Sequence, residues 1–332
     1  MDEKWIKYKF RNDLLSKINA IRTEIFKKSP VTIKEYGEKE ILGLEETNKF
    51  IGNLIYSSNP FMVCRFGASE MNMINSCLQV KHFPFRDTRK QAVERLCKLS
   101  GFFPNDVKKG GNFVELMLEN CQLVDLCGTW NLYMEDYVLD QYAPDAQITL
   151  LENLEPWNIV SNETMKPWTS ALKGKKVLVI HPFADTIKSQ YSNYRTKIFE
   201  RKYIADDILP QFELITIKAV QTLNFNTDNV EYNDWFEALD SMIKQCEKID
   251  FDVAIIGCGA YGFPLAAAIK QMGKGAIHLG GATQILFGIV GKRWEIGGYK
   301  IMLDQVRNEY WTRPNSFETP ANANEIENGC YW

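Results

Sequence analysis

The stretch FDVAIIGCGAYGFPLAAAIKQMGKGAIHLGG, residues 251–281, carries the strongest fold signal in the chain. An unbroken apolar run precedes Gly257-x-Gly259-x-x-Gly262, and an apolar segment that can begin a helix follows. This spacing is typical of a dinucleotide-binding turn, whose glycines allow a tight turn, close approach of a ligand and close packing of the helix. A phosphate at such a helix start would meet free N–H groups and the positive end of the helix dipole.

The residues after this loop argue against NAD as the ligand. An NAD site has an Asp or Glu about 20 residues further on, at the end of the next strand, where it binds the ribose hydroxyls. Here the next apolar run ends in His278, Leu279, Gly280 and Gly281, with no acid. We therefore expect no NAD. The glycine loop either binds another phosphate-bearing ligand or serves close packing alone.

Further short runs rich in Val, Ile, Leu or Phe read as buried strands, and helical patterns such as 186–203 and 233–249 separate most of them. Continuous apolar strands that alternate with helices predict parallel crossovers. The sequence therefore predicts an α/β fold with a doubly wound, mostly parallel, Rossmann-like sheet. The expected strands lie within residues 61–67, 121–130, 148–154, 175–183, 212–220, 251–258 and 275–281.

The first 28 residues predict a basic amphipathic helix, with eight Lys or Arg against four acids. Ser29-Pro30 ends the pattern. Such a helix either packs on the domain or on another subunit, which we favour, or lies on an anionic membrane surface. We expect residues 1–44 to form a helical extension and 45–332 a single domain, with a seam near 167–176. The apolar positions at helical spacing are Trp5, Ile6, Phe10, Leu14, Ile18, Ile21 and Ile25.

Composition narrows the class of protein. A net charge of −3 and a pI of about 5.8 give no overall basic field, so nucleic acid is not an expected partner. Eight scattered cysteines without a C-x-x-C pair, and a chain start without a leader pattern, predict reduced thiols in a cytoplasmic protein. No apolar run reaches the roughly 18 residues that span a bilayer. Binding at the inner face of a membrane remains open through the N-terminal helix.

Ligands of doubly wound sheets bind at the carboxyl ends of the strands, so the residues just after each strand are the candidates. His181, Pro182 and Phe183 end one strand, and Asp185 or Thr186 can cap the helix that follows. His181 is either a ligand contact or a half-buried turn residue.

Two other strand ends carry polar or aromatic groups. Arg65 and Gly67 follow the run 61–64, and Glu70 lies in the first turn of the next helix. Glu70 either complements the helix dipole, with Arg65 as its ion-pair partner, or acts as a metal ligand or base beside an arginine that clamps phosphate. Asp125 is expected inside the strand of 121–130. Aromatic faces that could stack on sugar rings come from Trp130, Trp157 and Trp168, although such residues are also ordinary core residues.

Four segments together resemble one known family. CRFGASE (64–70), KVLVIHPFADTIKSQY (176–191), residues 252–294, and the ending with YWTRP and ENGCYW are similar to bacterial GT-D-type glycosyltransferases. The resemblance runs in order from about residue 45 to the C-terminus. It implies a Rossmann-like domain that transfers a sugar from a nucleoside diphosphate donor to a glycan, lipid-linked or protein-linked glycan acceptor in surface polysaccharide or glycoprotein glycan synthesis.

The family also implies a divalent cation, Mn²⁺ or Mg²⁺, held by an Asp-x-Glu pair in an RFGDGE-like segment. This chain has Ala68-Ser69-Glu70 there, so Arg65, Gly67 and Glu70 carry over and the Asp does not. One carboxylate would have to hold the ion together with diphosphate oxygens. Arg65 and Glu70 are the expected catalytic residues, and Glu70 is also the candidate metal ligand. The residues expected to bind the nucleotide sugar are Gly67, His181, Pro182, Phe183, Thr186, Gln190, Gly257, Gly259, Tyr261, Gly262, Gly280, Gly281, Thr283, Gln284, Lys292 and Arg293.

Two alternatives stay open at this point. The missing Asp fits a catalytically weak, glycan-binding member of the family. The glycine loop alone fits another Rossmann-type enzyme, a dehydrogenase or a methyltransferase.

Overall fold

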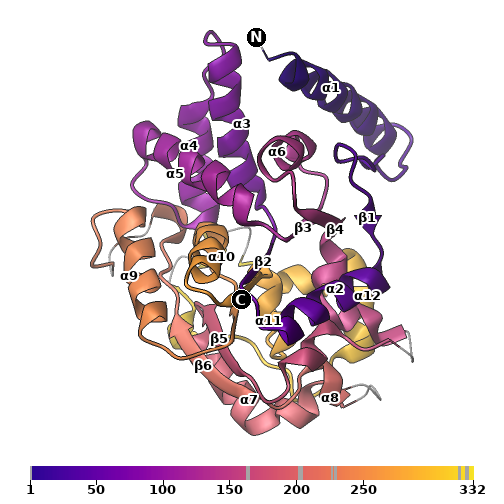
Figure 1. The fold of residues 1–332 in the computed structure, drawn as a ribbon, viewed down its shortest axis with the longest axis vertical. Coiled ribbons are helices and arrows are strands. Elements are labelled where there is room, and N and C mark those ends of the chain that lie inside the picture. Colours follow the sequence, from indigo (N-terminus) through magenta and orange to yellow (C-terminus); the bar gives the residue numbers. More distant parts are fainter. Residues whose placement is uncertain are drawn as a thin grey trace.

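The computed structural model describes residues 2–161, 165–200, 205–225, 227, 230–320, 323–325 and 329–332. A sheet of eight parallel strands runs through it in the order β1-β4-β3-β2-β8-β7-β5-β6 (Figure 1). The predicted doubly wound α/β class is confirmed. The strands are β1 (Ile41–Leu42), β2 (Phe61–Cys64), β3 (Leu126–Thr129), β4 (Gln147–Leu150), β5 (Lys176–His181), β6 (Glu213–Lys218), β7 (Val253–Ile256) and β8 (Gly275–His278).

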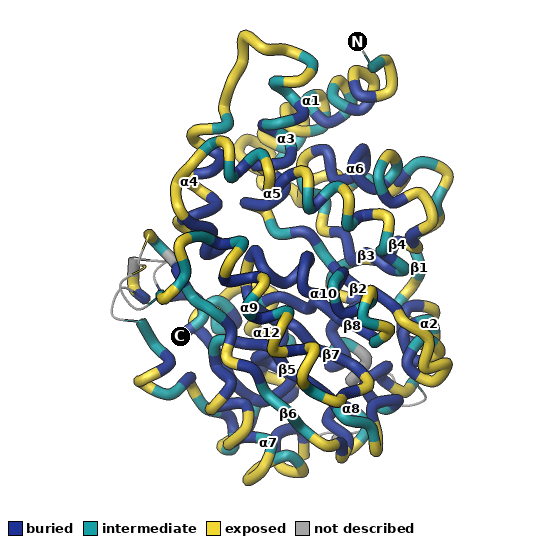
Figure 2. The backbone as a smooth tube through the Cα atoms, turned by 60° about the vertical axis from the view of Figure 1, so that its left-hand side comes forward, coloured by how far each residue is buried: buried dark blue, intermediate teal, exposed yellow. Residues whose placement is uncertain are grey.

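Successive side chains of each strand feed two separate cores, as the period of two requires. In β7, Ala254 and Ile256 join one core, whereas Val253 and Ile255 join the other. The helices that cover the first face include α3 (Ala68–His82), α4 (Arg89–Ser100), α5 (Val107–Asn120), α6 (Glu135–Tyr142), α9 (Trp235–Glu247) and α10 (Gly262–Gln271). Five cover the second: α2 (Leu44–Ser57), α7 (Ala184–Ile198), α8 (Ala205–Ile208), α11 (Thr283–Leu286) and α12 (Gly297–Val306). Figure 2 shows the central strands β2, β7 and β8 buried between these layers.

The sequence sets the helix boundaries through local capping. Asp234 is the N-cap of α9, which begins at Trp235. Its carboxylate accepts a hydrogen bond from the backbone N–H of Glu237, 2.9 Å away. Helix α4 ends at Gly101, whose φ of +76° is in the left-handed region that glycine adopts without strain. The expected helices 186–203 and 233–249 correspond to α7 and α9, and residues 201–203 lie outside the described residues.

Three expectations about the strands need correction. Residues 151–154 form a 3₁₀ helix rather than the end of a strand, and Leu154 packs against the position where Gly128 has no side chain. Asp125 precedes β3 instead of lying within it, because its carboxylate accepts hydrogen bonds from the Met62 N–H and from Lys270. The two-residue strand β1 was not predicted. The proposed domain boundary and the seam near 167–176 stay predictions.

Helix α1 (Glu3–Glu24) forms where the N-terminal pattern predicts it and lies at the edge of the molecule beyond α6 (Figure 1). Its contact with the domain differs from the expected one. The buried residues of the helix are Trp5, Tyr8 and Asn12, so Trp5 is the one predicted apolar position that packs inward. The other positions of the predicted apolar face are exposed, since the helix attaches through its polar side.

Candidate functional site

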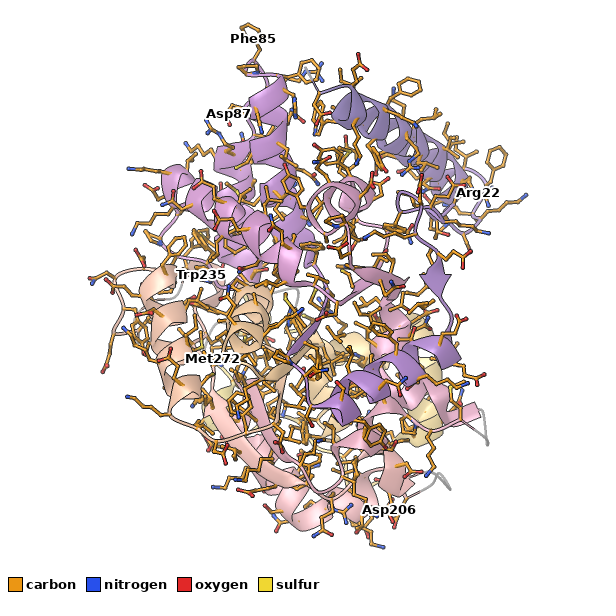
Figure 3. All side chains as sticks on the ribbon, in the orientation of Figure 1. Arg22, Phe85, Asp87, Asp206, Trp235 and Met272 are labelled. Carbon is orange, nitrogen blue, oxygen red and sulfur yellow. The ribbon has the colours of Figure 1, made fainter. Side chains whose placement is uncertain are left out.

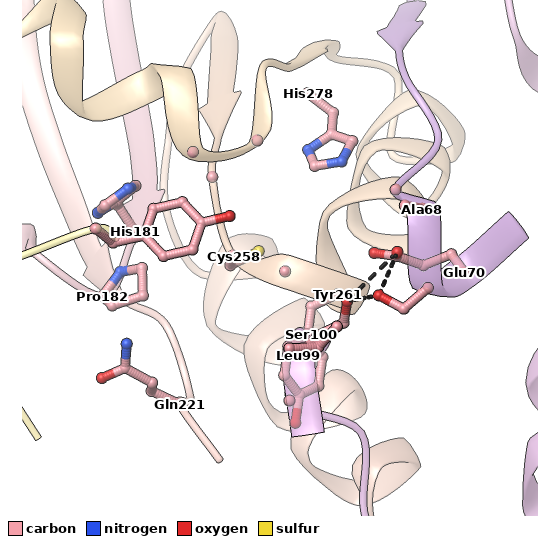
Figure 4. Close-up of a pocket in the computed structure, with 18 of the residues that line it drawn as sticks. Ala68, Glu70, Leu99, Ser100, His181, Pro182, Gln221, Cys258, Tyr261 and His278 are labelled. Carbon is pink, nitrogen blue, oxygen red and sulfur yellow. Dashed lines mark hydrogen bonds between the residues drawn. The ribbon is translucent and has the colours of Figure 1, made fainter. Parts of the chain in front are cut away.

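A pocket lies at the carboxyl edge of the sheet, where β2, β5, β7 and β8 end (Figure 4). It contains about 1140 Å³ of space, its open mouth included. The order in which successive strands are added to the sheet switches direction here, because β2, β3 and β4 lie to one side of β8, whereas β5, β6 and β7 lie to the other. The predicted residues that line the pocket are Arg65, Gly67, Glu70, His181, Pro182, Phe183, Gly257, Gly259, Tyr261, Gly280, Gly281, Gln284 and Arg293.

The three glycines of the fingerprint are required by contacts within the protein. A Cβ on Gly257 would lie 2.5 Å from the carbonyl oxygen of Gly280, and one on Gly262 would lie 2.0 Å from the His278 ring. Gly259 has a φ of +58°, and its Cβ would lie 2.6 Å from the carbonyl oxygen of Ser100. Gly262 therefore allows the predicted close packing of helix on sheet, whereas the space beside Gly259 is filled by protein and not by the proposed ligand.

The glycine pair after β8 makes room for two side chains of the pocket. A Cβ on Gly280 would come within 3.1 Å of the Arg65 guanidinium, and one on Gly281 within 2.5 Å of the Tyr331 ring. Arg293 donates a hydrogen bond to the Tyr331 hydroxyl at 2.9 Å and lies over the same ring. These contacts bring Arg65 and Arg293, two cations from opposite ends of the sequence, to one pocket.

Arg65 is held in place by two neighbours. Its Nε and one terminal nitrogen donate to the carbonyl oxygen of Phe66 at 3.2 and 3.1 Å, and its guanidinium lies 4.9 Å from the Trp130 ring centre. The Trp130 indole donates to the same Phe66 oxygen at 2.9 Å. Trp130 is 40% exposed, whereas Trp157 and Trp168 are 1% exposed. Of the three expected stacking residues, Trp130 is therefore the one that faces the pocket.

Glu70 is buried at the start of α3 and its carboxylate turns back toward Gly67. Ser69 and Ser100 both donate to its Oε2 at 3.4 Å, and their own hydroxyl oxygens are 2.6 Å apart (Figure 4). Burial raises the pKa of Glu70, although Arg65 and the serine hydroxyls oppose this shift. Among the described residues that line the pocket, Glu70 is the one acid.

The described residues do not offer a metal site built from the protein alone. They include no group of three or more His, Cys, Asp or Glu placed to hold an ion. A hard divalent cation prefers several oxygen ligands, and Glu70 supplies one carboxylate in a pocket that also holds three arginines. These residues do not fit the metal centre that the family resemblance implies.

Two buried histidines line the pocket in their neutral form. Burial lowers the pKa of His181 and of His278 to about 3 in each case, with Arg65 adding to the effect on His278. The backbone N–H of Phe183 donates to Nδ1 of His181 at 3.0 Å, which leaves the proton on Nε2. His181 is thus a buried, neutral residue of the pocket wall rather than a half-buried turn residue.

The helix start after His181 is already occupied by a carboxylate of the protein. The backbone N–H groups of Asp185 and Thr186 donate to Glu318 at 2.9 and 3.2 Å, and the Thr186 hydroxyl also bonds to it. Glu318, rather than Asp185 or Thr186, therefore caps the start of α7. Thr186 and Gln190 lie outside the pocket lining; the Gln190 amide donates to the carbonyl oxygen of Tyr310 at 2.9 Å.

Three more residues that were expected to bind the nucleotide sugar do not line the pocket. Gly262 packs on His278, the Thr283 hydroxyl donates to the carbonyl oxygen of Ile256 at 3.2 Å, and exposed Lys292 contacts Asn324. Gln284 does line the pocket. Its Nε2 donates to the carbonyl oxygens of Ile289 and Tyr331 at 3.2 Å, whereas its buried Oε1 has no hydrogen-bond partner among the described residues.

A smaller cavity adjoins the large pocket and was not predicted. Arg65, Gly281 and Arg293 border both, and Glu155 lies on the wall of the smaller one. Burial raises the pKa of Glu155 to about 7. No motif marks this residue, since it lies in an irregular segment after β4. The other walls of the smaller cavity come from Leu151, Leu154, Leu279, Ala282, Trp294 and Tyr299.

A second buried acid, Glu135, braces the loop that carries Trp130. Its Oε2 accepts the backbone N–H groups of Trp130 and Leu132 at 3.3 and 3.1 Å, and burial raises its pKa to about 7. Sequence reasoning also missed pocket residues whose positions depend on tertiary contacts. They are Arg95, Ser100, Gln221, Thr222 and Tyr331.

Fold and site together define an α/β protein with a ligand pocket at the carboxyl edge of a parallel sheet, lined by three arginines, neutral histidines and an exposed tryptophan. No helix among the described residues is long and apolar enough to span a membrane.

In comparisons with known proteins, the chain matches solved structures alone. No protein-family model and no curated protein matches the chain. Two solved structures are similar to it. One is described as the selenomethionine-substituted structure of domain of unknown function 1792, with 12% identity, a TM-score of 0.41, and coverage of 75% of this chain and 80% of that one. The other is described as the same highly conserved domain with a distinct glycosyltransferase fold, with 12% identity, a TM-score of 0.39, and coverage of 74% and 80%. TM-scores below 0.5 carry no conclusion about function, so the assignment below rests on the site.

Proposed function

We propose that the pocket binds a nucleoside diphosphate sugar and that the chain transfers its sugar to a hydroxyl of a glycan or glycoconjugate acceptor. The observation that carries this proposal is the pair Arg65 and Arg293 on the shared border of two adjoining cavities. The diphosphate of the donor carries two negative charges and gains a third as it leaves, and guanidinium groups suit bidentate binding of phosphate oxygens. The larger cavity would hold the donor and the smaller one the acceptor.

Polar and aromatic groups of the larger pocket match the rest of such a donor. The exposed face of Trp130 suits stacking on a base or sugar ring. The unpaired Oε1 of Gln284 needs a hydrogen-bond donor, which a ligand hydroxyl or amide would supply. Glu70 would accept a hydrogen bond from a sugar hydroxyl, because the serine hydroxyls already fix the position of its carboxylate.

The chemical step follows from these positions. The acceptor oxygen forms a bond to the anomeric carbon, and the bond from that carbon to the diphosphate oxygen breaks, with its electron pair leaving on the diphosphate. Arg65 and Arg293 stabilise the charge that develops on this leaving group. The acceptor hydroxyl gives its proton to Glu155, whose pKa of about 7 is suited to a general base near neutral pH.

The proposal is tested by incubating the protein with a set of nucleoside diphosphate sugars and measuring released nucleoside diphosphate, with and without Mn²⁺. We expect one donor class to be turned over slowly with water alone and faster with a suitable glycan. We further expect Arg65→Gln to lose this release while its melting temperature stays unchanged. Release that is equal in wild type and Arg65→Gln, or absent for every donor, would contradict the proposal.

A further inference from the structure

Helix α1 has its apolar side exposed to solvent, the reverse of an ordinary surface helix. The residues that form this side, named here the outer row, are 37–71% exposed. Their spacing of three or four residues puts them on one side of the helix. The outer row consists of Ile6, Phe10, Leu14, Ile18, Ile21 and Ile25.

The opposite side of α1 is fixed to the domain by specific contacts. The Trp5 ring stacks on His82 with centroids 4.3 Å apart, and the Tyr8 hydroxyl donates to Asp140 at 2.6 Å. Asn12 donates to the buried carboxylate of Asp136 at 3.0 Å. These contacts fix α1 on the domain and determine which side of the helix faces outward. The outer row is therefore exposed while the helix is attached.

The charge of this segment is opposite to that of the rest of the chain. Residues 1–28 carry eight basic and four acidic side chains, whereas the remaining 304 residues carry 31 basic and 38 acidic ones. Lys7 lies three residues before Phe10, and Lys17 lies three residues after Leu14, so both lysines project on the side of the outer row. Exposed Lys27 and Lys28 extend the basic charge past its end, while Glu3 and Glu24 lie near its two ends. Figure 3 shows Arg22 at the outer end of the helix.

We propose that the outer row is a docking surface for an anionic lipid bilayer, with α1 lying in the plane of the interface. Apolar side chains would enter the boundary between headgroups and acyl chains, and the lysines would reach the phosphate layer. A second copy of this chain fits less well, because pairing of two outer rows would bring two segments of net positive charge together. This inference is independent of the donor and the reaction proposed above.

The test uses the full chain in co-sedimentation with vesicles of phosphatidylcholine alone and of phosphatidylcholine with an equal share of phosphatidylglycerol. We expect binding to the phosphatidylglycerol vesicles, weakened by salt, and little binding to phosphatidylcholine alone. Ile21→Ser/Ile25→Ser should weaken binding about tenfold or more, since each removes a side chain whose burial favours the bound state. Lys7→Gln/Lys17→Gln should weaken it by about fivefold per lysine on the anionic vesicles.

The matched control is Ile296→Ser/Ile301→Ser, which removes two isoleucines that are 68% and 69% exposed at α12. This variant should bind vesicles as wild type does, and all variants should keep the wild-type melting temperature. The proposal is overturned if wild type does not sediment with phosphatidylglycerol vesicles or if the two isoleucine pairs behave alike. It is equally overturned if wild type is a dimer in sedimentation velocity that the outer-row variant makes monomeric, with no vesicle binding.

Discussion

The guanidinium of Arg65 lies over the indole of Trp130, 4.9 Å from the centre of its ring. Both side chains also donate to the carbonyl oxygen of Phe66, so a cation and an aromatic face are fixed together just after the carboxyl end of β2. A planar cation that is already positioned loses less entropy when it binds phosphate.

Two replacements of Arg65 distinguish the contribution of its charge from that of its planar guanidinium. Arg65→Lys keeps the cation but loses the planar stack and the two-pronged bond, so we expect donor affinity to fall about tenfold or more, as loss of a charged hydrogen bond does. The donor affinity of Arg65→Gln should be lower still, because this variant also loses the positive charge. Isothermal titration calorimetry with the active donor measures this, and Arg86→Gln, an exposed arginine outside the pocket, serves as the control. Equal affinity in Arg65→Gln and Arg86→Gln would rule out the diphosphate contact.

Glu155 should determine the acidic limb of the rate profile. Its pKa is raised to about 7, so it is protonated below that pH and becomes a base above it. We expect the wild-type rate to rise with pH through about 7, and Glu155→Gln to lose both this limb and about 100-fold or more in kcat. The control is Glu119→Gln, an exposed acid of α5 that lines neither cavity. A Glu155→Gln enzyme that keeps the wild-type limb would assign the proton to another group.

Glu70→Gln should remove most transfer while the fold stays intact. The amide keeps one oxygen to accept from Ser69 and Ser100, but it loses the charge with which the carboxylate would bind a sugar hydroxyl. We expect a higher KM for the donor, with unchanged far-UV circular dichroism. Turnover and KM equal to those of wild type would remove Glu70 from the site.

Gly259→Ala should act on stability before it acts on the ligand. The new Cβ would lie 2.6 Å from the Ser100 carbonyl oxygen at a φ of +58°. We expect a loss of unfolding free energy of about 2 kcal/mol or more in urea denaturation. Gly297→Ala is the matched control, because Gly297 has a φ of +59° with nothing within 4 Å of the added atom. Similar losses in the two variants would mean that the contact with Ser100 is relaxed at little cost.

The sequence was informative where a pattern is local. Unbroken apolar runs predicted seven of the strand positions, because buried parallel strands are apolar on both faces. The residues just after those strands include Arg65, Glu70 and His181, all of which line the pocket. Sequence reasoning failed where tertiary contacts decide. Glu318 caps α7 from a distant segment, and the burial that raises the pKa of Glu155 has no signature in its neighbours.

The outward side of α1 is the clearest case of this limit. Helical spacing predicted the helix and its apolar side correctly, but a domain surface normally covers such a side. Which side faces inward is decided by partners on other elements, chiefly Asp136 and Asp140 of α6, and these cannot be paired with Asn12 and Tyr8 from spacing alone.

The central claim is that the pocket binds a nucleoside diphosphate sugar, and a thermal-shift panel tests it most directly. The melting temperature of wild type and Arg65→Gln would be measured with nucleoside diphosphate sugars, NAD(H) and S-adenosylmethionine, each with and without Mn²⁺. We predict that at least one nucleotide sugar raises the melting temperature of wild type, with a smaller rise in Arg65→Gln, and that Mn²⁺ is not required for this rise. A rise with NAD(H) or S-adenosylmethionine and none with any nucleotide sugar would contradict the account.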